Sequence, residues 1–170
     1  MRRALYILAD LRDEDLLWLN KAGRVRDIRT GEVLIQAGRE VRELFFVVAG
    51  ELDVVVDRVG LVARLAQGDV AGESSFVERR LPVASVIAAG PGQVLAVPRG
   101  AVDDHIARDH AFAARFYRAL AVFLSDRLRT ATSGAPTGSV EELDDELLDS
   151  LHVAGDRFNR LLDLLTGREH

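Results

Sequence analysis

The spacing of apolar residues changes twice along the chain and predicts three successive regions: a short helix, a series of strands and a long helix. Residues 13–23 start with three acidic positions, continue with apolar ones and end at a glycine, which is the pattern of a short helix. From residue 23 to residue 98, short β-branched and aromatic runs alternate with glycines about every eight to twelve residues, which is typical of strands in a compact antiparallel barrel or roll. Beyond residue 98, apolar residues recur at steps of three and four, which predicts a long amphipathic helix over about residues 109–130.

The C-terminal part contains a break and a second helical pattern. Residues 133–138 read SGAPTG, a composition typical of a linker, and Ser139 with Glu142 fits a capping box at a helix start. An apolar seam then follows at Leu143, Leu147, Leu151, Ala154, Phe158, Leu161 and Leu165. We therefore expect a domain at 1–130, a linker at 131–139 and an amphipathic helix at 140–170. The expected fold class is α+β: an antiparallel β-roll of the double-stranded β-helix or jelly-roll type, flanked by helices and extended by a C-terminal helix.

Composition narrows the function classes. The chain has 170 residues, 48% of them hydrophobic and 29% charged, which suits a folded globular protein. Since it has no cysteine, disulfides, thiolate metal sites and cysteine nucleophiles are excluded, and the four histidines show no metal-ligand spacing. No apolar run approaches the roughly 18 residues of a membrane span, and the first residues do not resemble a signal peptide. We expect a cytoplasmic protein that binds no metal.

Charge is distributed unevenly along the chain. The net charge is −5, and the last 31 residues hold nine acidic and three basic residues, whereas the preceding ones are nearly balanced. Because no part concentrates positive charge, nucleic acid is not an expected partner. The seam between Leu143 and Leu165 is too long to remain in water, so it must pack on its own roll, on a second copy or on a partner protein. A homo-oligomer or a protein partner, bound through residues 140–166, is the leading expectation.

Residues 65–76, LAQGDVAGESSF, form the segment whose pattern most strongly indicates a binding site. A strand ends there, two glycines permit a tight turn, and a helix of one or two turns starts near Glu73. Free amides at Ser74, Ser75 and Phe76 would form a cradle for an anion, and Glu73 would accept a hydroxyl from a sugar. The alternative is a plain corner of the roll, because glycine followed by a polar residue opens many helices. No nucleophile elbow, no Walker motif of the nucleoside triphosphatases and no dinucleotide fingerprint is present, so we expect no enzymatic activity.

Three segments in order carry a resemblance to a known family: 31–38 (GEVLIQAG), 44–54 (LFFVVAGELDV) and 65–73 (LAQGDVAGE). Over about residues 10–130 the chain resembles cyclic nucleotide-binding domains, the β-roll module of the catabolite activator protein, cyclic-nucleotide-dependent kinases and cyclic-nucleotide-gated channels. The resemblance implies a phosphate-binding cassette in which Gly72 shapes the turn and Glu73 binds the ribose 2′-hydroxyl. It also implies a non-catalytic regulatory module that binds cAMP or cGMP and signals through its C-terminal helices.

The cassette departs from the family at the position that pairs with the cyclic phosphate. The resemblance leads us to expect an arginine eleven residues after the cassette glycine, but the chain has Val83 there, followed by Ala84 and Ser85. Loss of one charge-assisted hydrogen bond costs about 1.5–3 kcal/mol. Arg79 or Arg80 would restore the charge if one of them turned back over the phosphate, although adjacent charges more often lie on a solvated loop. The expected ligand-binding set is Gly72, Glu73, Ser74, Ser75, Arg79, Arg80, Val83, Ala84 and Ser85.

A second hypothesis follows from the same departure. The roll would then be a degenerate cyclic nucleotide-binding-like scaffold that mediates protein–protein interaction. Residues 74–76 with residues 81–85 also resemble a bacterial subgroup of the family that is linked to transport and export systems.

Overall fold

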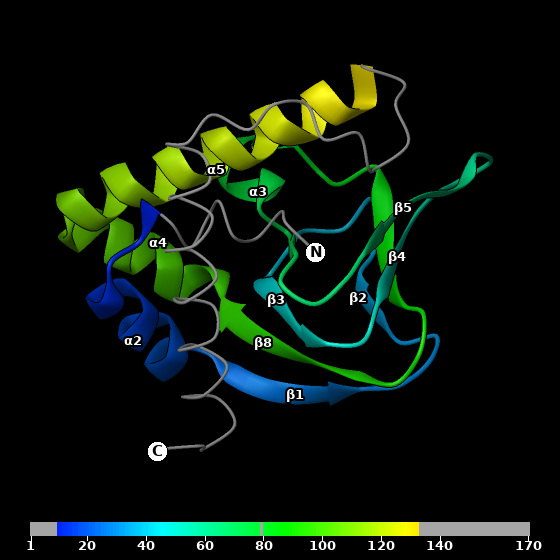
Figure 1. Ribbon diagram of the computed structural model, residues 1–170, viewed down its shortest axis with the longest axis horizontal. Coiled ribbons are helices and arrows are strands. Elements are labelled where there is room, and N and C mark those ends of the chain that lie inside the picture. The colour runs from blue at the N-terminus through cyan, green and yellow to red at the C-terminus, as the bar shows by residue number, and fades with distance from the viewer. Residues whose placement is uncertain (1–9, 79, 133–170) are drawn as a thin grey trace, which may run out of the picture.

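The protein, described here by a computed structural model, contains two antiparallel four-stranded sheets with helices packed against one of them (Figure 1). The structure describes residues 10–78 and 80–132. The strands are β1 (Arg24–Ile28), β2 (Val33–Ile35), β3 (Glu43–Ala49), β4 (Leu52–Val56), β5 (Gly60–Leu65), β6 (Val70–Ala71), β7 (Ala84–Ala88) and β8 (Gly92–Pro98). The helices are α2 (Asp13–Ala22), α3 (Ser74–Val77), α4 (Arg99–Arg108) and α5 (His110–Thr132). The predictions of an opening helix, a central strand region and a long helix near residues 109–130 are confirmed.

The two sheets form a roll of the expected α+β class. One sheet has the strand order β1-β8-β3-β6 and the other β2-β7-β4-β5, and every strand pair is antiparallel. The central pair of the first sheet, β3 with β8, places Phe45 opposite Ala96 and Phe46 opposite Leu95. Because successive side chains of a strand point to opposite faces, this sheet contributes to two separate cores.

Residues of β3 show the division directly. Phe45 and Val47 belong to the core inside the roll, whereas Leu44, Phe46 and Val48 belong to the core between the sheet and the helices. All five are at most 5% exposed. A strand buried on both faces reads as a continuous apolar run, which explains why residues 44–49 show no polar alternation.

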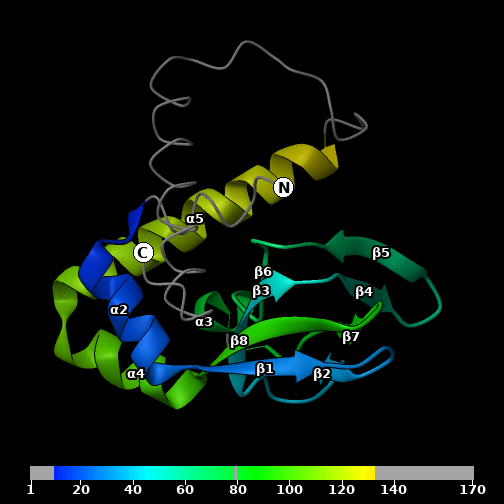
Figure 2. The same ribbon diagram turned by 60° about the horizontal axis from the view of Figure 1, so that its bottom comes forward.

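The helices α2, α4 and α5 cover the face of the β1-β8-β3-β6 sheet that points away from the roll interior (Figure 2). Trp18 of α2 stacks on His105 of α4, with ring centroids 4.0 Å apart, and lies edge-on to Phe112 of α5 at 5.4 Å. Trp18 therefore anchors α2 to the other two helices. Asp109 caps α5 by accepting the Phe112 amide at 2.9 Å, and this hydrogen bond lowers the pKa of Asp109.

A buried ion pair joins α2 to α5. The Arg115 guanidinium donates to both carboxylate oxygens of Asp15 at 2.8 Å, and the Asp15 side chain is only 4% exposed. Asp15 also accepts the backbone N–H of Arg12, which fixes the first turn of α2. The hydrogen bond from Arg115 to Asp15 raises the pKa of the guanidinium, and the bidentate contact joins the two helices.

None of the described helices is both long enough and apolar enough to cross a membrane. The predicted linker at 131–139 lies almost wholly, and the helix at 140–170 wholly, outside the described residues, so both stay predictions.

The ion pair between Asp15 and Arg115 generates a stability prediction. Replacing Arg115 with methionine leaves a buried carboxylate without its cation, and we expect the free energy of unfolding to fall by about 3 kcal/mol in urea denaturation. Arg118→Met is the matched control on the same helix. The Arg118 side chain is 75% exposed and meets Asp10 at 3.5 Å, so its loss should cost less than about 1 kcal/mol. Equal losses for the two variants would contradict the assigned role.

Candidate functional site

The roll contains a cavity of about 370 Å³ bounded by its strands, by α3 and by the segment that leads into β7. This size lies within the roughly 300–1,000 Å³ typical of small-molecule pockets. The corner of the roll formed by residues 65–76 therefore contains open space, as a ligand site requires, and its own apolar side chains do not fill it.

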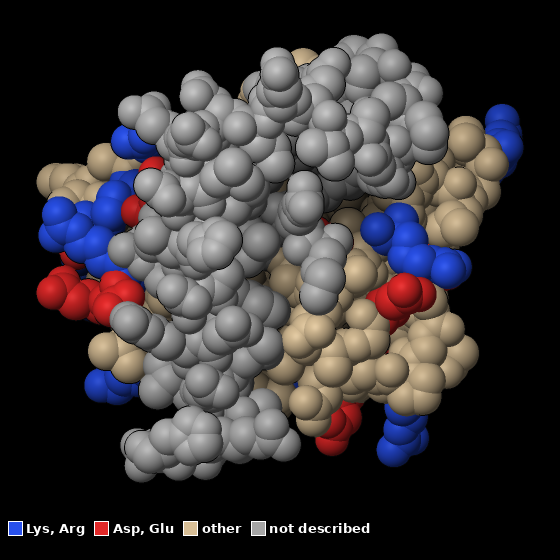
Figure 3. All heavy atoms as spheres, in the orientation of Figure 1, with Lys and Arg blue, Asp and Glu red and all other residues tan. Residues whose placement is uncertain are grey.

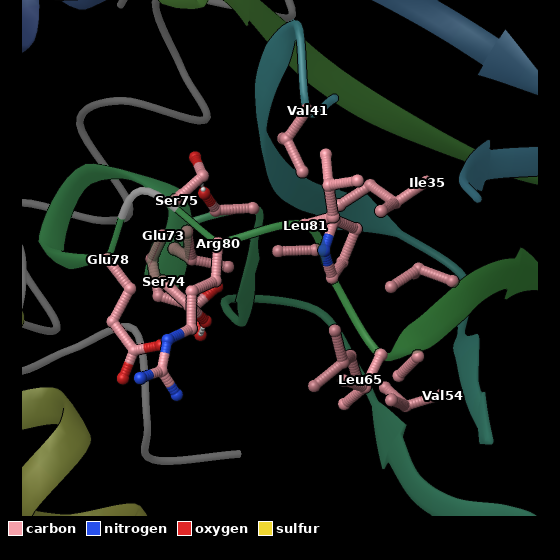
Figure 4. Close-up of a pocket in the computed structure, with 17 residues that line it drawn as sticks. Ile35, Val41, Val54, Leu65, Glu73, Ser74, Ser75, Glu78, Arg80 and Leu81 are labelled. Atoms are coloured by element: carbon pink, nitrogen blue, oxygen red, sulfur yellow. Dashed lines mark hydrogen bonds between the residues drawn. The ribbon is translucent and has the colours of Figure 1, made fainter. Parts of the chain in front are cut away.

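The cavity has an apolar part and a polar part (Figure 4). The figure shows Ile35, Val41, Val54 and Leu65 on one side and the polar residues of α3 and the following loop on the other. The polar lining residues are Glu73, Ser74, Ser75, Glu78 and Arg80. An apolar body with a polar end is the kind of ligand that this lining matches.

Gly72 gives the cassette turn its shape. Its φ is +93°, a left-handed conformation that favours glycine. An added Cβ would lie 2.9 Å from the backbone oxygen of Glu43 and 3.1 Å from Val41 Cγ1. The turn thus passes so close to β3 that no side chain fits there.

Glu73 follows directly and is only 2% exposed although it lines the cavity. Its Oε1 accepts a hydrogen bond from the Ser74 hydroxyl at 3.3 Å. Ser75, which is 8% exposed, donates its hydroxyl to the Gly72 carbonyl at 2.7 Å. Ser75 therefore holds the turn, whereas Glu73 presents a carboxylate at the polar end of the cavity.

The expectation of free amides at this turn is wrong for two of the three residues. The Ser75 amide donates to the Gly72 carbonyl at 3.3 Å, and the Phe76 amide donates to the Glu73 carbonyl at 3.1 Å. These bonds close the four-residue helix α3 on itself. An anion in this cavity therefore cannot depend on those two N–H groups.

Phe76 points away from the cavity and into the helical layer. Its ring meets Phe116 of α5 edge-to-face at 5.5 Å, and the Arg99 guanidinium of α4 lies 4.9 Å from the ring centroid. The cassette helix thus contacts the ligand cavity on one side and two of the covering helices on the other.

The other predicted site residues differ in position. Val83 lines the rim and is 80% exposed, and Ala84 and Arg80 also line the cavity. Ser85 is not among the lining residues, because its hydroxyl accepts the Ala37 amide at 3.0 Å. Arg79 lies outside the described residues.

Sequence reasoning missed much of the lining. Glu78, Leu81 and Pro82 come from the loop after α3, and the apolar walls come from inward-facing strand positions. Strand periodicity could have supplied the walls, since alternate residues face one side. The loop positions had no such signal, because they depend on a long-range bond from the Gly38 amide to the Pro82 carbonyl at 2.8 Å.

Residues 10–78 and 80–132 give little support for a metal site or a nucleic-acid interface. No group of three or more histidine, aspartate or glutamate residues gathers there in a way that could hold a metal ion. On the face drawn in Figure 3, basic and acidic side chains are interspersed and form no broad basic patch.

Comparison with known proteins decides the family. The cyclic nucleotide-binding domain family matches residues 25–109, half of the chain. The chain belongs to this family. No curated protein matches the sequence.

Solved structures of the family agree in fold. A putative cyclic nucleotide-binding protein from Geobacter metallireducens has a TM-score of 0.65 at 19% identity, with 72% of this chain and 91% of that chain covered. A cyclic nucleotide-binding domain from Methylobacillus flagellatus has the same TM-score and identity, with 80% and 85% covered. The regulatory subunit of a cAMP-independent protein kinase A from Trypanosoma brucei has a TM-score of 0.52 at 26% identity, and the match covers 60% of this chain but only 40% of that one.

The close approach of Gly72 to β3 predicts the effect of a methyl group. Gly72→Ala adds a steric clash with a backbone oxygen to the cost of a left-handed alanine. Gly31→Ala is the control, because Gly31 has a φ of +80° but nothing within 4 Å of an added Cβ. We expect a loss of about 1–2 kcal/mol for the control and at least about 1 kcal/mol more for Gly72→Ala, measured by urea denaturation. Indistinguishable losses would show that the turn is not tightly packed on β3.

Proposed function

We propose that this chain is a non-catalytic, cytoplasmic regulatory module that binds a cyclic nucleotide, cAMP or cGMP, in the roll cavity and signals through its C-terminal helices. The observation that carries the proposal is the open cavity whose polar end holds the buried carboxylate of Glu73 beside the glycine turn, in a chain of this family.

Glu73 is suited to bind a ribose hydroxyl. Its carboxylate is almost completely removed from solvent, where a hydrogen bond from a neutral donor is stronger than in water. The adjacent Ser74 hydroxyl already donates to Oε1 at 3.3 Å and supports its orientation. A ribose hydroxyl would add a further donor to the same carboxylate.

Arg80 is the group best placed to face the cyclic phosphate. It is the one arginine among the described residues that lines the cavity, and it lies at the same polar end as Glu73 (Figure 4). Because its side chain is exposed, its attraction to a phosphate would be partly screened by water. We therefore expect weak binding.

A route for signalling is present in α3. A ligand at Glu73 and Ser74 would act on a helix whose Phe76 packs between Phe116 and the Arg99 guanidinium. If α3 moves on binding, α4 and α5 must repack. The ligand can shift the helices only by the difference between its affinities for the two arrangements.

Isothermal titration calorimetry with cAMP and cGMP tests the proposal. We expect a dissociation constant in the micromolar to millimolar range, weakened about twofold to fivefold by Arg80→Ala, since an exposed ion pair contributes only about 0.2–1 kcal/mol. Arg29→Ala is the matched control, because Arg29 is exposed but lies outside the cavity. Absence of both heat and thermal stabilisation at millimolar ligand would exclude the function.

The alternative is a degenerate scaffold for protein–protein interaction, with a link to a transport or export system as its most specific form. It is favoured by the apolar rim of the cavity, where Leu81 and Val83 are 57% and 80% exposed. A triple mutant of the Trypanosoma brucei regulatory subunit, in which one substitution introduces an arginine, is bound to cAMP in its A site. This suggests how an arginine at Val83 would separate the two functions.

Val83→Arg should increase cyclic nucleotide affinity about ten- to a hundredfold, because it restores a charge partner at the rim. Val77→Arg is the control, since it adds the same charge to an exposed valine that does not line the cavity. A sensor shows measurable binding before the substitution and tighter binding after it, whereas a scaffold gains binding only after it. An equal effect of the two arginines would mean that net charge alone matters.

A further inference from the structure

The long helix α5 has a second apolar stripe on the side that faces away from the helical core. Phe112, Phe116, Leu120 and Phe123 form its buried face and are at most 1% exposed. A different set, with steps of three, four, three and four, runs along the other side: Ala114, Tyr117, Ala121, Leu124 and Leu128. This set is called the outer seam.

Much of the outer seam is accessible. Tyr117 is 43% exposed and Leu128 is 66% exposed, Ala114 and Ala121 are exposed, and Leu124 is half-buried at the edge of the core. A stripe with heptad spacing on a water-facing side is typical of a helix that packs on another helix. The remaining question is which helix covers it.

The chain itself contains a segment with a matching apolar pattern. The apolar seam of residues 140–166 starts at Leu143, and α5 ends at Thr132. The seven residues between α5 and the segment 140–166, residues 133–139, contain two glycines and a proline. A connection of this length between two helices favours antiparallel neighbours.

An antiparallel arrangement brings the two seams into register over five successive contacts. Residue numbers that sum to 271 or 272 are then opposite one another: Leu128 with Leu143, Leu124 with Leu147, Ala121 with Leu151, Tyr117 with Ala154, and Ala114 with Phe158. In three of these pairs an alanine meets a large side chain. Alternation of small and large residues across an interface lets the two helices pack closely.

Charge favours the same arrangement. From residue 122 to its end, α5 contains two arginines and one acidic residue, and residues 140–149 contain six acidic residues and no basic one. In an antiparallel pair these two stretches lie side by side, because both flank the connection. A parallel pairing would bring the acidic stretch to the beginning of α5 instead.

We propose that residues 140–166 form a helix that lies antiparallel along the outer seam of α5 in the same chain. The seam is then covered without a partner, and the acidic stretch neutralises the basic end of α5. This docking surface lies outside the ligand cavity, so the docking can be tested independently of nucleotide binding.

Cysteine cross-linking tests the proposal in the full-length chain, which has no cysteine of its own. Ala121→Cys with Leu151→Cys should form an intrachain disulfide under mild oxidation, detected as a faster-migrating monomer on a non-reducing gel. Two controls keep Leu151→Cys. Ala114→Cys tests the register, since it lies about 10 Å along α5 from position 121. Val59→Cys tests specificity, since Val59 is 70% exposed but lies between β4 and β5.

The matched pair should react at least about tenfold faster than either control, because docking raises the effective concentration of the two thiols. Leu128→Cys with Leu143→Cys should react as fast as the first matched pair. This second pair covers the case in which a substitution at position 121 or 151 disturbs the packing locally. Disulfide-linked dimers from the matched pairs would assign the seam to a second copy and overturn the proposal. Equal rates for matched and control pairs, in variants whose circular dichroism is unchanged, would overturn it as well.

Discussion

The alternation of side chains along β3 is the constraint on which the rest of the structure depends. Phe45 and Val47 fill the roll, and Phe46 and Val48 support the helices, so one strand sets the position of both cores. Its pairing with β8 gives the same division, with Val94 and Ala96 inside and Leu95 and Val97 outside. A slip of one residue would exchange the two sets and leave neither core packed.

This division places α3 at the boundary between the two cores. Gly72 and Glu73 line the cavity, and Phe76, only three residues later, is packed against the helical layer. A helix of four residues has too few contacts of its own to be independently stable, so its position depends on both neighbours. Phe76 therefore brings the segment that lines the cavity into contact with α5, and the ion pair between Asp15 and Arg115 joins α5 to α2.

Much of this arrangement could be predicted from sequence, because period and glycine placement are local signals. The strand region and α5 follow from such signals, whereas the cassette at Gly72 and Glu73 was implied by the resemblance to a family. The bidentate contact between Asp15 and Arg115 did not, since the two residues are 100 positions apart and nothing near either of them indicates the other. The predicted amide cradle was wrong for a related reason: spacing marks the helix start, but Ser75 and Phe76 spend their N–H groups on closing that turn. Ser85 shows the same limit, since its side chain serves the Ala37 amide across 48 residues.

The charges around the cavity explain why valine at position 83, in place of an arginine, would cost more affinity for an anion than one lost hydrogen bond. Glu73 is buried and Glu78 lies nearby, so an anion that enters the polar end meets two carboxylates and, among the described lining residues, one arginine. Arg80 is exposed, and a flexible charge in water loses rotamer freedom on binding while its attraction is screened. If the proposed nucleotide binds, its affinity would come mainly from contacts of the base and the ribose with the apolar walls and the Glu73 carboxylate, rather than from the phosphate.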